Sequence, residues 1–379
     1  MANKWLSQMT ADFGIVASQL KTALPPVIPA RSPSLNWALD IGGFQPGKVY
    51  VPYGPESAGK SMLVMMVIAD YQKRDPDAIF VWFDAEFSFN LPLFVKLGGD
   101  PERLYLRRSN DPEKIFDYMK KDMKELLQEG CPIRGFVVDS IKSILYPKEQ
   151  NMKKTTDQKM GGTGASYLPT ALKWIIPVVA EFNLLAFLIQ QVTMEIDPNK
   201  AKRNPYVVTE GKALKHAADT MLEITKLDSK NGVVESGKAL SGSGHQVGHI
   251  IRVKIKKNRL GRPARVAQFT YHYDQGVINT GEELFELGKT LGLIFHPVSE
   301  STGRPNAMMW AFGKYPPIKG ENNMKQFVVD TPQVQDELMK ACFSHQESTT
   351  VNVDADGVVE DIVEDLEEET DGISFDDES

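Results

Sequence analysis

One octapeptide constrains the fold of this chain more than any other feature. It consists of Gly54, Pro55, Glu56, Ser57, Ala58, Gly59, Lys60 and Ser61, and it fits the pattern G-x-x-x-x-G-K-[ST]. A β-rich run precedes it and the helix-forming sequence MLVMMVIADYQK follows it. Glycines let such a turn point successive N–H groups at phosphate oxygens, and the helix adds its positive end. The pattern predicts a phosphate-binding loop in which Lys60 meets the outer phosphates and Ser61 suits Mg²⁺.

Residues 48–280 alternate short β-rich runs with helical stretches, which predicts βαβ units and a mostly parallel sheet of the α/β class. The expected strands are Val49–Tyr53, Ile79–Phe83, Phe136–Val138 and Leu184–Ile189, with helices at about 60–73, 112–128 and 166–182. Residues 281–345 indicate a small separate unit with helices near 282–291 and 331–343.

Polar side chains follow three of these strands, where ligands bind in open α/β sheets. Asp139 follows the run Gly135–Val138 and is the Walker B candidate, which would hold Mg²⁺ through water. Glu86 stands just beyond Phe80–Phe83 and could orient an attacking water as general base. Gln191 lies beyond Ile189 and could reach a γ-phosphate. Simple strand capping is the alternative for each.

The segment from 230 to 273 combines a flexible connection with basic strands. Residues 230–248 are rich in Gly and Ser and are expected to be flexible, so a solvated loop is favoured over a metal site for His245 and His249. Strands are expected at 250–257 and 266–273. Within the first, apolar and basic residues alternate, which predicts a half-buried basic edge strand. Its members are Ile251, Val253 and Ile255 inward, Arg252, Lys254 and Lys256 outward, followed by Lys257 and Arg259.

The charge distribution permits nucleic-acid binding although the net charge is −7. Of the 50 acidic residues, 13 lie between Asp354 and Glu378, a segment without Lys or Arg, so the remainder has 37 acidic and 43 basic residues and a net charge of +6. A basic body with an acidic tail is typical of nucleic-acid proteins, and a solubilising end is the alternative. Such a tail is expected to be disordered.

The two cysteines and the N-terminal sequence bear on compartment and assembly. Cys131 and Cys342 are far apart, and neither a signal peptide nor a long apolar run is visible, which favours a cytoplasmic protein without a membrane span. Near the N-terminus, apolar residues at helical spacing form a stripe that precedes an extended linker at Pro25–Pro29. A helix with this stripe would pack on the core of its own chain or on a neighbouring molecule. The stripe is formed by Leu6, Met9, Phe13, Val16 and Leu20.

Six segments, in their order along the chain, resemble the core motifs of the RecA recombinases. They are Gly54–Ser61, Asp84–Glu86, Val137–Ser140, the stretch ending at Gln191, Gly211–Lys215 and Val253–Arg259. The resemblance covers residues 34–285 well and is greatest to the phage UvsX branch, given the acidic tail. It implies an N-terminal oligomerisation helix and linker at 1–33 and a RecA-type ATPase core at 34–280. A small C-terminal α/β domain at 281–347 and an acidic tail at 348–379 would follow.

The same resemblance implies roles for individual residues. Glu86 would be the catalytic base, Gln191 the sensor of the γ-phosphate, and Lys257 and Arg259 would reach the ATP of an adjacent subunit. Two loops, at about 148–164 and 192–211, would meet single-stranded DNA. Their implied contacts are the wedges Met160 and Ile196, the basic residues Lys153, Lys154, Lys159, Lys200, Lys202 and Arg203, and Gly161, Gly211 and Lys212.

Three positions depart from the family pattern. Thr193 stands where RecA has a DNA-contacting Arg, and His216 stands where RecA has a Phe at the subunit boundary. The position of the adenine-stacking aromatic is Leu93, with Phe94 beside it.

The resemblance thus predicts an ATP- and Mg²⁺-dependent homologous recombinase that assembles as a helical filament on single-stranded DNA and pairs it with homologous duplex DNA. Mediator and single-strand-binding proteins are the further expected partners, and a phage-encoded chain would act in the host cytoplasm. Two rival functions remain at this point. One is a hexameric DnaB-like DNA helicase, and the other is a small-molecule kinase using the same phosphate loop.

Overall fold

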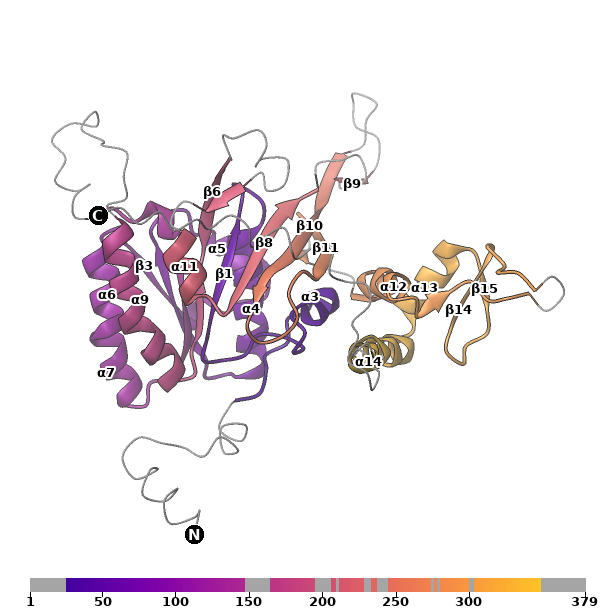
Figure 1. Ribbon diagram of the computed structural model, residues 1–379, viewed down its shortest axis with the longest axis horizontal. Coiled ribbons are helices and arrows are strands. Elements are labelled where there is room, and N and C mark those ends of the chain that lie inside the picture. The colour runs from indigo at the N-terminus through magenta and orange to yellow at the C-terminus, as the bar shows by residue number, and fades with distance from the viewer. Residues whose placement is uncertain are drawn as a thin grey trace, which may run out of the picture.

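The computed structural model describes residues 25–146, 164–194, 206–208, 211–227, 233–236, 245–273, 276–277, 280–299 and 303–348. They form a large α/β core and a smaller C-terminal unit that projects from one end of it (Figure 1). Among them, no helix is long and apolar enough to cross a membrane. The expected N-terminal helix and acidic tail lie outside the described residues, and the domain boundaries stay predictions.

One large sheet organises the core. Its main path runs β12-β11-β10-β8-β1-β5-β4-β2-β3. The six strands from β8 to β3 are mutually parallel, and β10, β11 and β12 continue the sheet in antiparallel pairing. The bounds are β1 Lys48–Gly54, β2 Ile79–Asp84, β3 Leu104–Arg108, β4 Ile133–Asp139, β5 Leu185–Leu188, β8 Thr220–Lys226, β10 His245–Asn258, β11 Val266–His272 and β12 Gly276–Val277.

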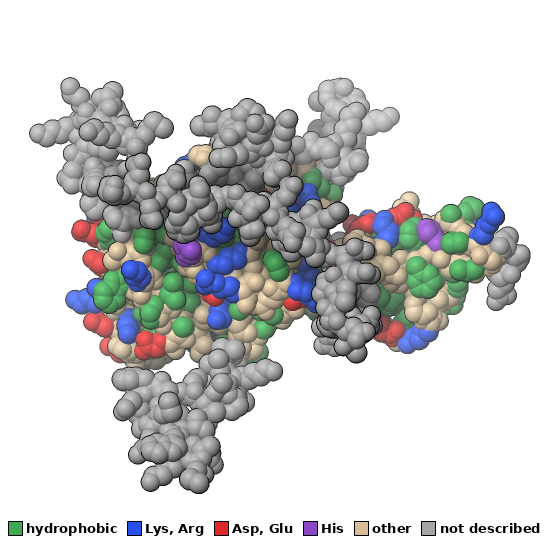
Figure 2. Space-filling view, viewed as in Figure 1, with side chains coloured by type: hydrophobic (Ala, Val, Ile, Leu, Met, Phe, Trp, Pro, Cys, Tyr) green, Lys and Arg blue, Asp and Glu red, His purple; other side chains and the backbone are tan. Residues whose placement is uncertain are grey.

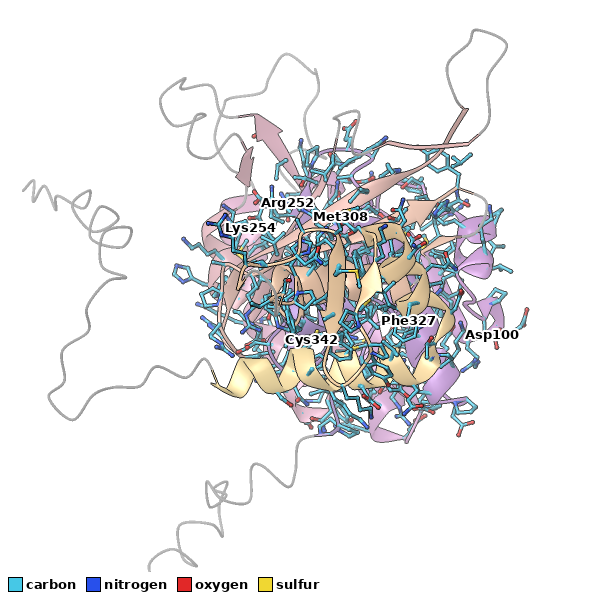
Figure 3. All side chains as sticks on the ribbon, turned by 90° about the vertical axis from the view of Figure 1, so that its right-hand side faces the viewer. Asp100, Arg252, Lys254, Met308, Phe327 and Cys342 are labelled. Atoms are coloured by element: carbon cyan, nitrogen blue, oxygen red, sulfur yellow. The ribbon has the colours of Figure 1, made fainter. Side chains whose placement is uncertain are left out.

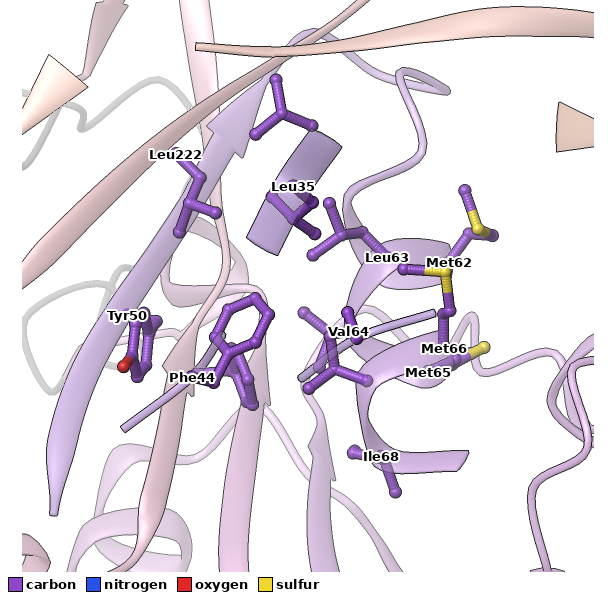
Figure 4. Close-up of a cluster of buried hydrophobic side chains, with 14 of the residues drawn as sticks. Leu35, Phe44, Tyr50, Met62, Leu63, Val64, Met65, Met66, Ile68 and Leu222 are labelled. Atoms are coloured by element: carbon purple, nitrogen blue, oxygen red, sulfur yellow. The ribbon is translucent and has the colours of Figure 1, made fainter. Parts of the chain in front are cut away.

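Helices cover both faces of the sheet because successive residues of each strand point to opposite sides. In β1, Tyr50 packs into one apolar cluster, while Val49, Val51 and Tyr53 pack into another. The Tyr50 face is covered by α3 (Pro33–Ala38) and α4 (Lys60–Arg74), whose side chains pack together in Figure 4. The opposite face is covered by α6 (Pro112–Lys120), α7 (Asp122–Gln128), α9 (Gly164–Glu181) and α11 (Gly211–Ala217). The short helix α5 (Leu91–Lys96) lies beside α4.

Local sequence signals explain where these helices begin. Asp111 caps α6 by accepting the backbone N–H of Glu113 at 3.0 Å, and Pro112 occupies the first helical position. The single helix expected at 112–128 is instead two helices, because the chain bends at Lys121, which ends α6 and precedes α7.

Two further predictions about the basic segment were wrong. The supposed connection at 230–248 contains β9 (Val233–Ser236), and β10 already begins at His245. Moreover, β10 is not an edge strand, because it pairs with β8 on one side and β11 on the other. The alternation itself is confirmed: Ile251, Val253 and Ile255 are fully buried, whereas Arg252 and Lys254 point away from the core and lie close together in Figure 3.

The C-terminal unit has its own apolar core. It contains α12 (Thr280–Thr290), β13 (Ile294–Phe295), β14 (Met309–Phe312), β15 (Ile318–Lys319), α13 (Glu321–Asp330) and α14 (Pro332–Ser348). The three strands form an antiparallel sheet, and helix residues such as Phe285, Val328 and Leu338 pack beside it. Figure 3 looks onto this unit, with Met308, Phe327 and Cys342 labelled.

A buried carboxyl group joins the C-terminal unit to the core. Glu283 of α12 accepts hydrogen bonds from the Ser32 hydroxyl at 2.5 Å and the Ser34 backbone N–H at 2.7 Å. Both serines belong to α3 or its N-cap. Burial raises the pKa of Glu283 to about 7, although the hydrogen bonds from the serines act in the opposite direction.

The Glu283→Gln variant should therefore gain stability over the wild type as pH rises. A raised folded-state pKa means that the contribution of Glu283 is complete below its unfolded pKa and is lost as pH rises through about 7. Glutamine keeps an acceptor oxygen and cannot ionise. Urea unfolding at pH 5 to 8 should show a difference that grows to about 3 kcal/mol. A difference that is the same at every pH would contradict this explanation.

Candidate active site

The phosphate loop joins β1 to α4 at the edge of the sheet where the parallel strands end. Gly54 ends β1, and a Cβ atom there would lie 2.0 Å from the carbonyl oxygen of Ile224 in β8, so only glycine fits. Gly59 precedes α4 with φ 97°, a left-handed conformation suited to glycine. Because Gly59 has no side chain to cap the helix, the first N–H groups of α4 face the loop and can bind an anion.

Two side chains at the start of α4 face the loop and the neighbouring strand. The Lys60 ammonium donates hydrogen bonds to the carbonyl oxygens of Gly54 at 3.0 Å and Pro55 at 2.6 Å. Burial lowers the pKa of Lys60, and the nearby carboxylates of Asp139 and Glu86 oppose this shift. The Ser61 hydroxyl donates to Asp139 Oδ2 at 2.7 Å. The structure thus brings Lys60, Ser61 and Asp139 together.

The expected polar residues at the strand ends also meet. Asp139 ends β4 opposite Asp84 at the end of β2. Gln191 lies in β6 (Gln190–Met194), which continues beside β1 and places Gln191 opposite Gly54. Its side-chain amide donates to Glu86 Oε1 at 2.5 Å. A carboxylate, an amide, a lysine and a hydroxyl therefore surround one space.

The acidic side of this space suits a divalent cation. Burial raises the pKa of Asp139 to about 7, and the charges of Glu86 and Asp84 act in the same direction, against the Ser61 hydrogen bond and Lys60. No cluster of three or more His, Cys, Asp or Glu suited to a metal occurs among the described residues. Ser61 and Asp139 nonetheless fit Mg²⁺, which usually keeps several waters and takes other ligands from phosphates.

A cleft of about 530 Å³ connects these polar groups to an apolar end. Its polar lining comprises Glu56, Ser57, Gly59, Lys60, Ser61, Glu86, Asp139 and Gln191, and its other end is lined by Met62, Leu93, His249, Ile251 and Tyr271. Leu93 thus lines the cleft, whereas Phe94 is fully buried in the core. Met62, Ile251 and Tyr271 were not predicted as cleft residues from the sequence. The only signal was the inward alternation of Ile251.

The solvated-loop interpretation of His249 was wrong. His249 is a buried residue of β10, and its ring lies 5.5 Å from that of Tyr271 and 5.7 Å from that of Tyr273. The Gly- and Ser-rich composition of residues 230–248 hid this part of β10 from prediction. The strand begins at His245, before the alternation of apolar residues that starts at Ile251. His249 instead belongs to the aromatic wall of the cleft.

Lys257 and Arg259 do not line the cleft of their own subunit. The Lys257 ammonium donates to the carbonyl oxygens of Lys215 and, at 2.6 Å, of Ala218, at the C-terminal end of α11. Burial, followed by the neighbouring Arg259 charge, lowers the pKa of Lys257. Arg259 is exposed, as is His216 on α11. Lys257 and Arg259 therefore lie outside the cleft that contains Lys60.

Most of the expected DNA contacts lie outside the described residues. These are Lys153, Lys154, Lys159, Met160, Gly161, Ile196, Lys200, Lys202 and Arg203. Gly211 and Lys212 begin α11, and Thr193 lies in β6, which pairs antiparallel with β7 (Tyr206–Val208). The second expected loop is thus bracketed by a β6–β7 pair and by α11, and its DNA contacts stay predictions.

Comparison with known proteins decides the family. The family model described as the RecA N-terminal domain matches residues 7–278. The chain belongs to the RecA family. Its α/β core is accordingly the RecA-type fold. Protein RecA of Campylobacter lari is 29% identical over 315 residues, which is 83% of each chain. Protein RecA of Brucella anthropi is 29% identical over 365 residues, or 95% of this chain and 90% of that one.

Protein RecA of Campylobacter hominis is also 29% identical, over 343 residues that cover 90% of this chain and 89% of that one. The family resemblance predicted from the six motifs is therefore confirmed. The narrower placement in the phage UvsX branch stays a prediction, because these relatives are bacterial RecA proteins.

Proposed function

We propose that this RecA-family chain is an ATP-dependent homologous recombinase of the phage UvsX branch, acting in DNA recombination and repair as a helical filament on single-stranded DNA. The cleft that joins Lys60, Ser61, Asp139, Glu86 and Gln191 carries this proposal. It combines a phosphate loop with a carboxylate able to act as general base. A phage recombinase would act in the host cytoplasm and depend on mediator and single-strand-binding proteins.

The proposed chemistry follows from the placement of these side chains. The N–H groups of the phosphate loop and Lys60 bind the β- and γ-phosphates. Ser61, and Asp139 through water, would hold Mg²⁺, which would supply positive charge to neutralise the phosphates. Glu86 accepts a proton from the water whose oxygen attacks the γ-phosphorus, and ADP leaves. Gln191, hydrogen bonded to Glu86 at 2.5 Å, reports the γ-phosphate to β6 and the DNA loop beyond it.

The apolar end of the cleft is the proposed nucleobase site. Leu93 comes from α5, Met62 from α4, and His249 and Tyr271 from neighbouring strands. Flat aromatic rings beside aliphatic side chains provide the apolar contacts that a purine prefers. His249 and Tyr271 therefore replace the stacking aromatic that position 93 lacks.

Single-stranded DNA would bind through phosphate contacts from the two expected loops. Figure 2 shows Lys and Arg side chains gathered over the middle of the core, on the side where β8, β10 and α11 lie in Figure 1. Contacts to phosphates are independent of sequence, which suits a protein whose specificity comes from base pairing between the two DNA molecules.

Stimulation of ATP hydrolysis by single-stranded DNA tests the proposed function. Hydrolysis should be slow without DNA and faster with single-stranded DNA, because filament assembly completes the site. The same assay with candidate small-molecule acceptors tests the kinase alternative. A rate that is the same with and without DNA contradicts the recombinase assignment, and electron micrographs that show closed rings rather than filaments favour a DnaB-like helicase.

Mixing two inactive variants should restore part of the activity. Lys60→Ala damages the phosphate-loop face and Lys257→Ala the proposed cap face of a head-to-tail contact. In an equal mixture that still assembles, about a quarter of the contacts have both faces intact, so ATP hydrolysis should recover toward that fraction.

The matched control mixes Lys60→Ala with Glu86→Gln. Both substitutions lie in the same cleft, so no contact in that mixture is intact and activity should stay low. If Lys60→Ala and Lys257→Ala co-assemble on DNA and regain nothing, Lys257 does not act on the neighbouring nucleotide.

A further inference from the structure

The turn that carries Glu86 is held by the side chain of Asp84. Asp84 ends β2 and is fully buried. Its Oδ1 accepts the backbone N–H of Ser88 at 2.9 Å, and its Oδ2 accepts that of Phe89 at 3.2 Å. These bonds close residues 85–89 back onto the end of β2.

The other side of the turn is fixed by β4. The backbone N–H groups of Ala85 and Glu86 both donate to the carbonyl oxygen of Asp139, at 2.7 Å and 3.2 Å. Glu86 therefore lies between two anchors, one on each neighbouring strand. Its side chain meets the Gln191 amide at 2.5 Å and the Ser143 hydroxyl at 3.4 Å.

The backbone between the anchors is strained. Phe87 has φ 57°, in the left-handed region that bulky residues rarely adopt. Such a conformation persists only where surrounding structure imposes it. The Phe87 side chain is 55% exposed, so its own packing contributes little, and the hydrogen bonds to Asp84 supply the constraint.

Burying a carboxylate costs free energy that an ordinary turn does not require. The cation that pairs with Asp84 is Arg108 of β3, whose Nε lies 3.4 Å from Asp84 Oδ2 and whose side chain is 54% exposed. Because the Arg108 side chain is half exposed, solvent screens this ion pair, and it offsets only part of the cost of burying Asp84. The two N–H groups thus provide most of the compensation for burial.

We propose that Asp84 is a positioning residue for hydrolysis that acts by orienting Glu86. This inference rests on the proposed role of Glu86 as general base. Without Asp84, the turn relaxes toward ordinary φ values and the Glu86 carboxylate moves relative to the water it activates. The phosphate loop stays in place, because β1 and α4 hold it.

Asp84→Asn is the primary test. Asparagine has the same shape but only one oxygen to accept the two N–H groups. The kcat of DNA-stimulated ATP hydrolysis should fall by about ten- to 10²-fold, the range expected when a reacting group is displaced by about 1 Å. The KM for ATP should stay within about twofold, because β1 and α4 hold the phosphate loop in both proteins. Asp84→Ala, which removes both acceptors, should lose more.

A double-mutant cycle identifies the route of the effect. In the Glu86→Gln background, Asp84→Asn should lower kcat by less than about threefold, because positioning a side chain that cannot act as base gains nothing. Equal losses in both backgrounds would show that Asp84 acts elsewhere and would overturn the proposal. Glu86→Gln alone tests the proposed function separately: normal hydrolysis by that variant means that Glu86 is not the base.

Asp75→Asn is the matched control. Asp75 also accepts a backbone N–H two residues ahead, from Asp77 at 3.1 Å, and pairs with an arginine, Arg134, at 2.8 Å. Asp75 precedes β2 and Asp84 ends it, so the two residues lie at opposite ends of the strand. The substitution of Asp75 should leave kcat unchanged.

Arg108→Gln gives a second test that leaves the buried residue intact. Loss of this ion pair should lower kcat by about threefold, because a half-exposed ion pair contributes only modestly to holding Asp84 in the orientation that positions Glu86. Thermal unfolding establishes which variants are folded. If Asp84→Asn is not folded, Arg108→Gln tests whether Asp84 positions Glu86. Wild-type kcat in the folded variants overturns the proposal.

Discussion

ATP hydrolysis by the Lys60→Ala variant is expected to fall by at least about 10²-fold, as happens when a donor that stabilises transition-state charge is removed. Lys60 is the cation in the cleft, and its ammonium faces the loop at the N-terminus of α4. ATP-dependent DNA binding should be lost as well. The fold should be retained, because alanine favours the helix and the lysine lies at a ligand site.

Steady-state ATP hydrolysis with single-stranded DNA measures this effect, and thermal unfolding checks the fold. Lys96→Ala is the matched control, because Lys96 also donates to a backbone carbonyl, that of Tyr273 at 2.8 Å, but does not line the cleft. It should hydrolyse ATP normally. Undiminished DNA-stimulated hydrolysis by Lys60→Ala would overturn the assignment of the phosphate loop.

Glu86→Gln is expected to separate nucleotide binding from hydrolysis. Glutamine preserves the shape of the side chain and can still pair with Gln191, but it cannot accept a proton from water. Hydrolysis should fall by about 10²-fold or more, the contribution of a positioned general base. ATP binding should persist because Lys60 and the loop N–H groups are untouched, and filaments should become long-lived.

Single-turnover hydrolysis and nucleotide binding, measured on the same preparation, test this separation. Glu113→Gln is a control on the exposed first turn of α6, where no change is expected. If Glu86→Gln hydrolyses ATP at the wild-type rate, another group is the base. If it fails to bind ATP, Glu86 contributes to the binding site rather than to proton transfer.

The polar half of the site could be predicted from the sequence because its signals are local. The octapeptide 54–61 carries its own turn chemistry, and Asp139 and Glu86 directly follow apolar runs that are read as strands. Parallel strands end at one edge of the sheet, so these groups had to meet. Gln191 followed by the same argument, and its side-chain amide donates a hydrogen bond to Glu86.

The apolar half could not be predicted, because it is assembled from distant elements. Tyr271 and His249 reach the cleft only because β10 and β11 add to the sheet beside β8. That order depends on topology, which a pattern of alternation does not contain. Because the alternation does not contain the strand order, β10 was also mistaken for an edge strand. Its basic outer face indicated solvent on one side and said nothing about its neighbours.

The composition of one segment led to a wrong prediction of its structure. The Gly/Ser-rich stretch at 230–248 suggested a loop, yet Gly248 occupies β10, where a Cβ atom would lie 2.3 Å from the Tyr271 carbonyl oxygen. Glycine there marks a close approach of two strands. The role of Asp84 was hidden for another reason, since its hydrogen bonds to Ser88 and Phe89 depend on the conformation of the turn rather than on residue type.

Homologous pairing tests the central claim most directly. The protein is incubated with circular single-stranded DNA, Mg²⁺ and either ATP or ADP, and linear duplex of homologous or unrelated sequence is then added. A recombinase should form joint molecules only with homologous duplex and only with ATP. The Lys60→Ala variant should form none. Strand separation that ignores homology, or an absence of joint molecules despite DNA-stimulated hydrolysis, would contradict the account.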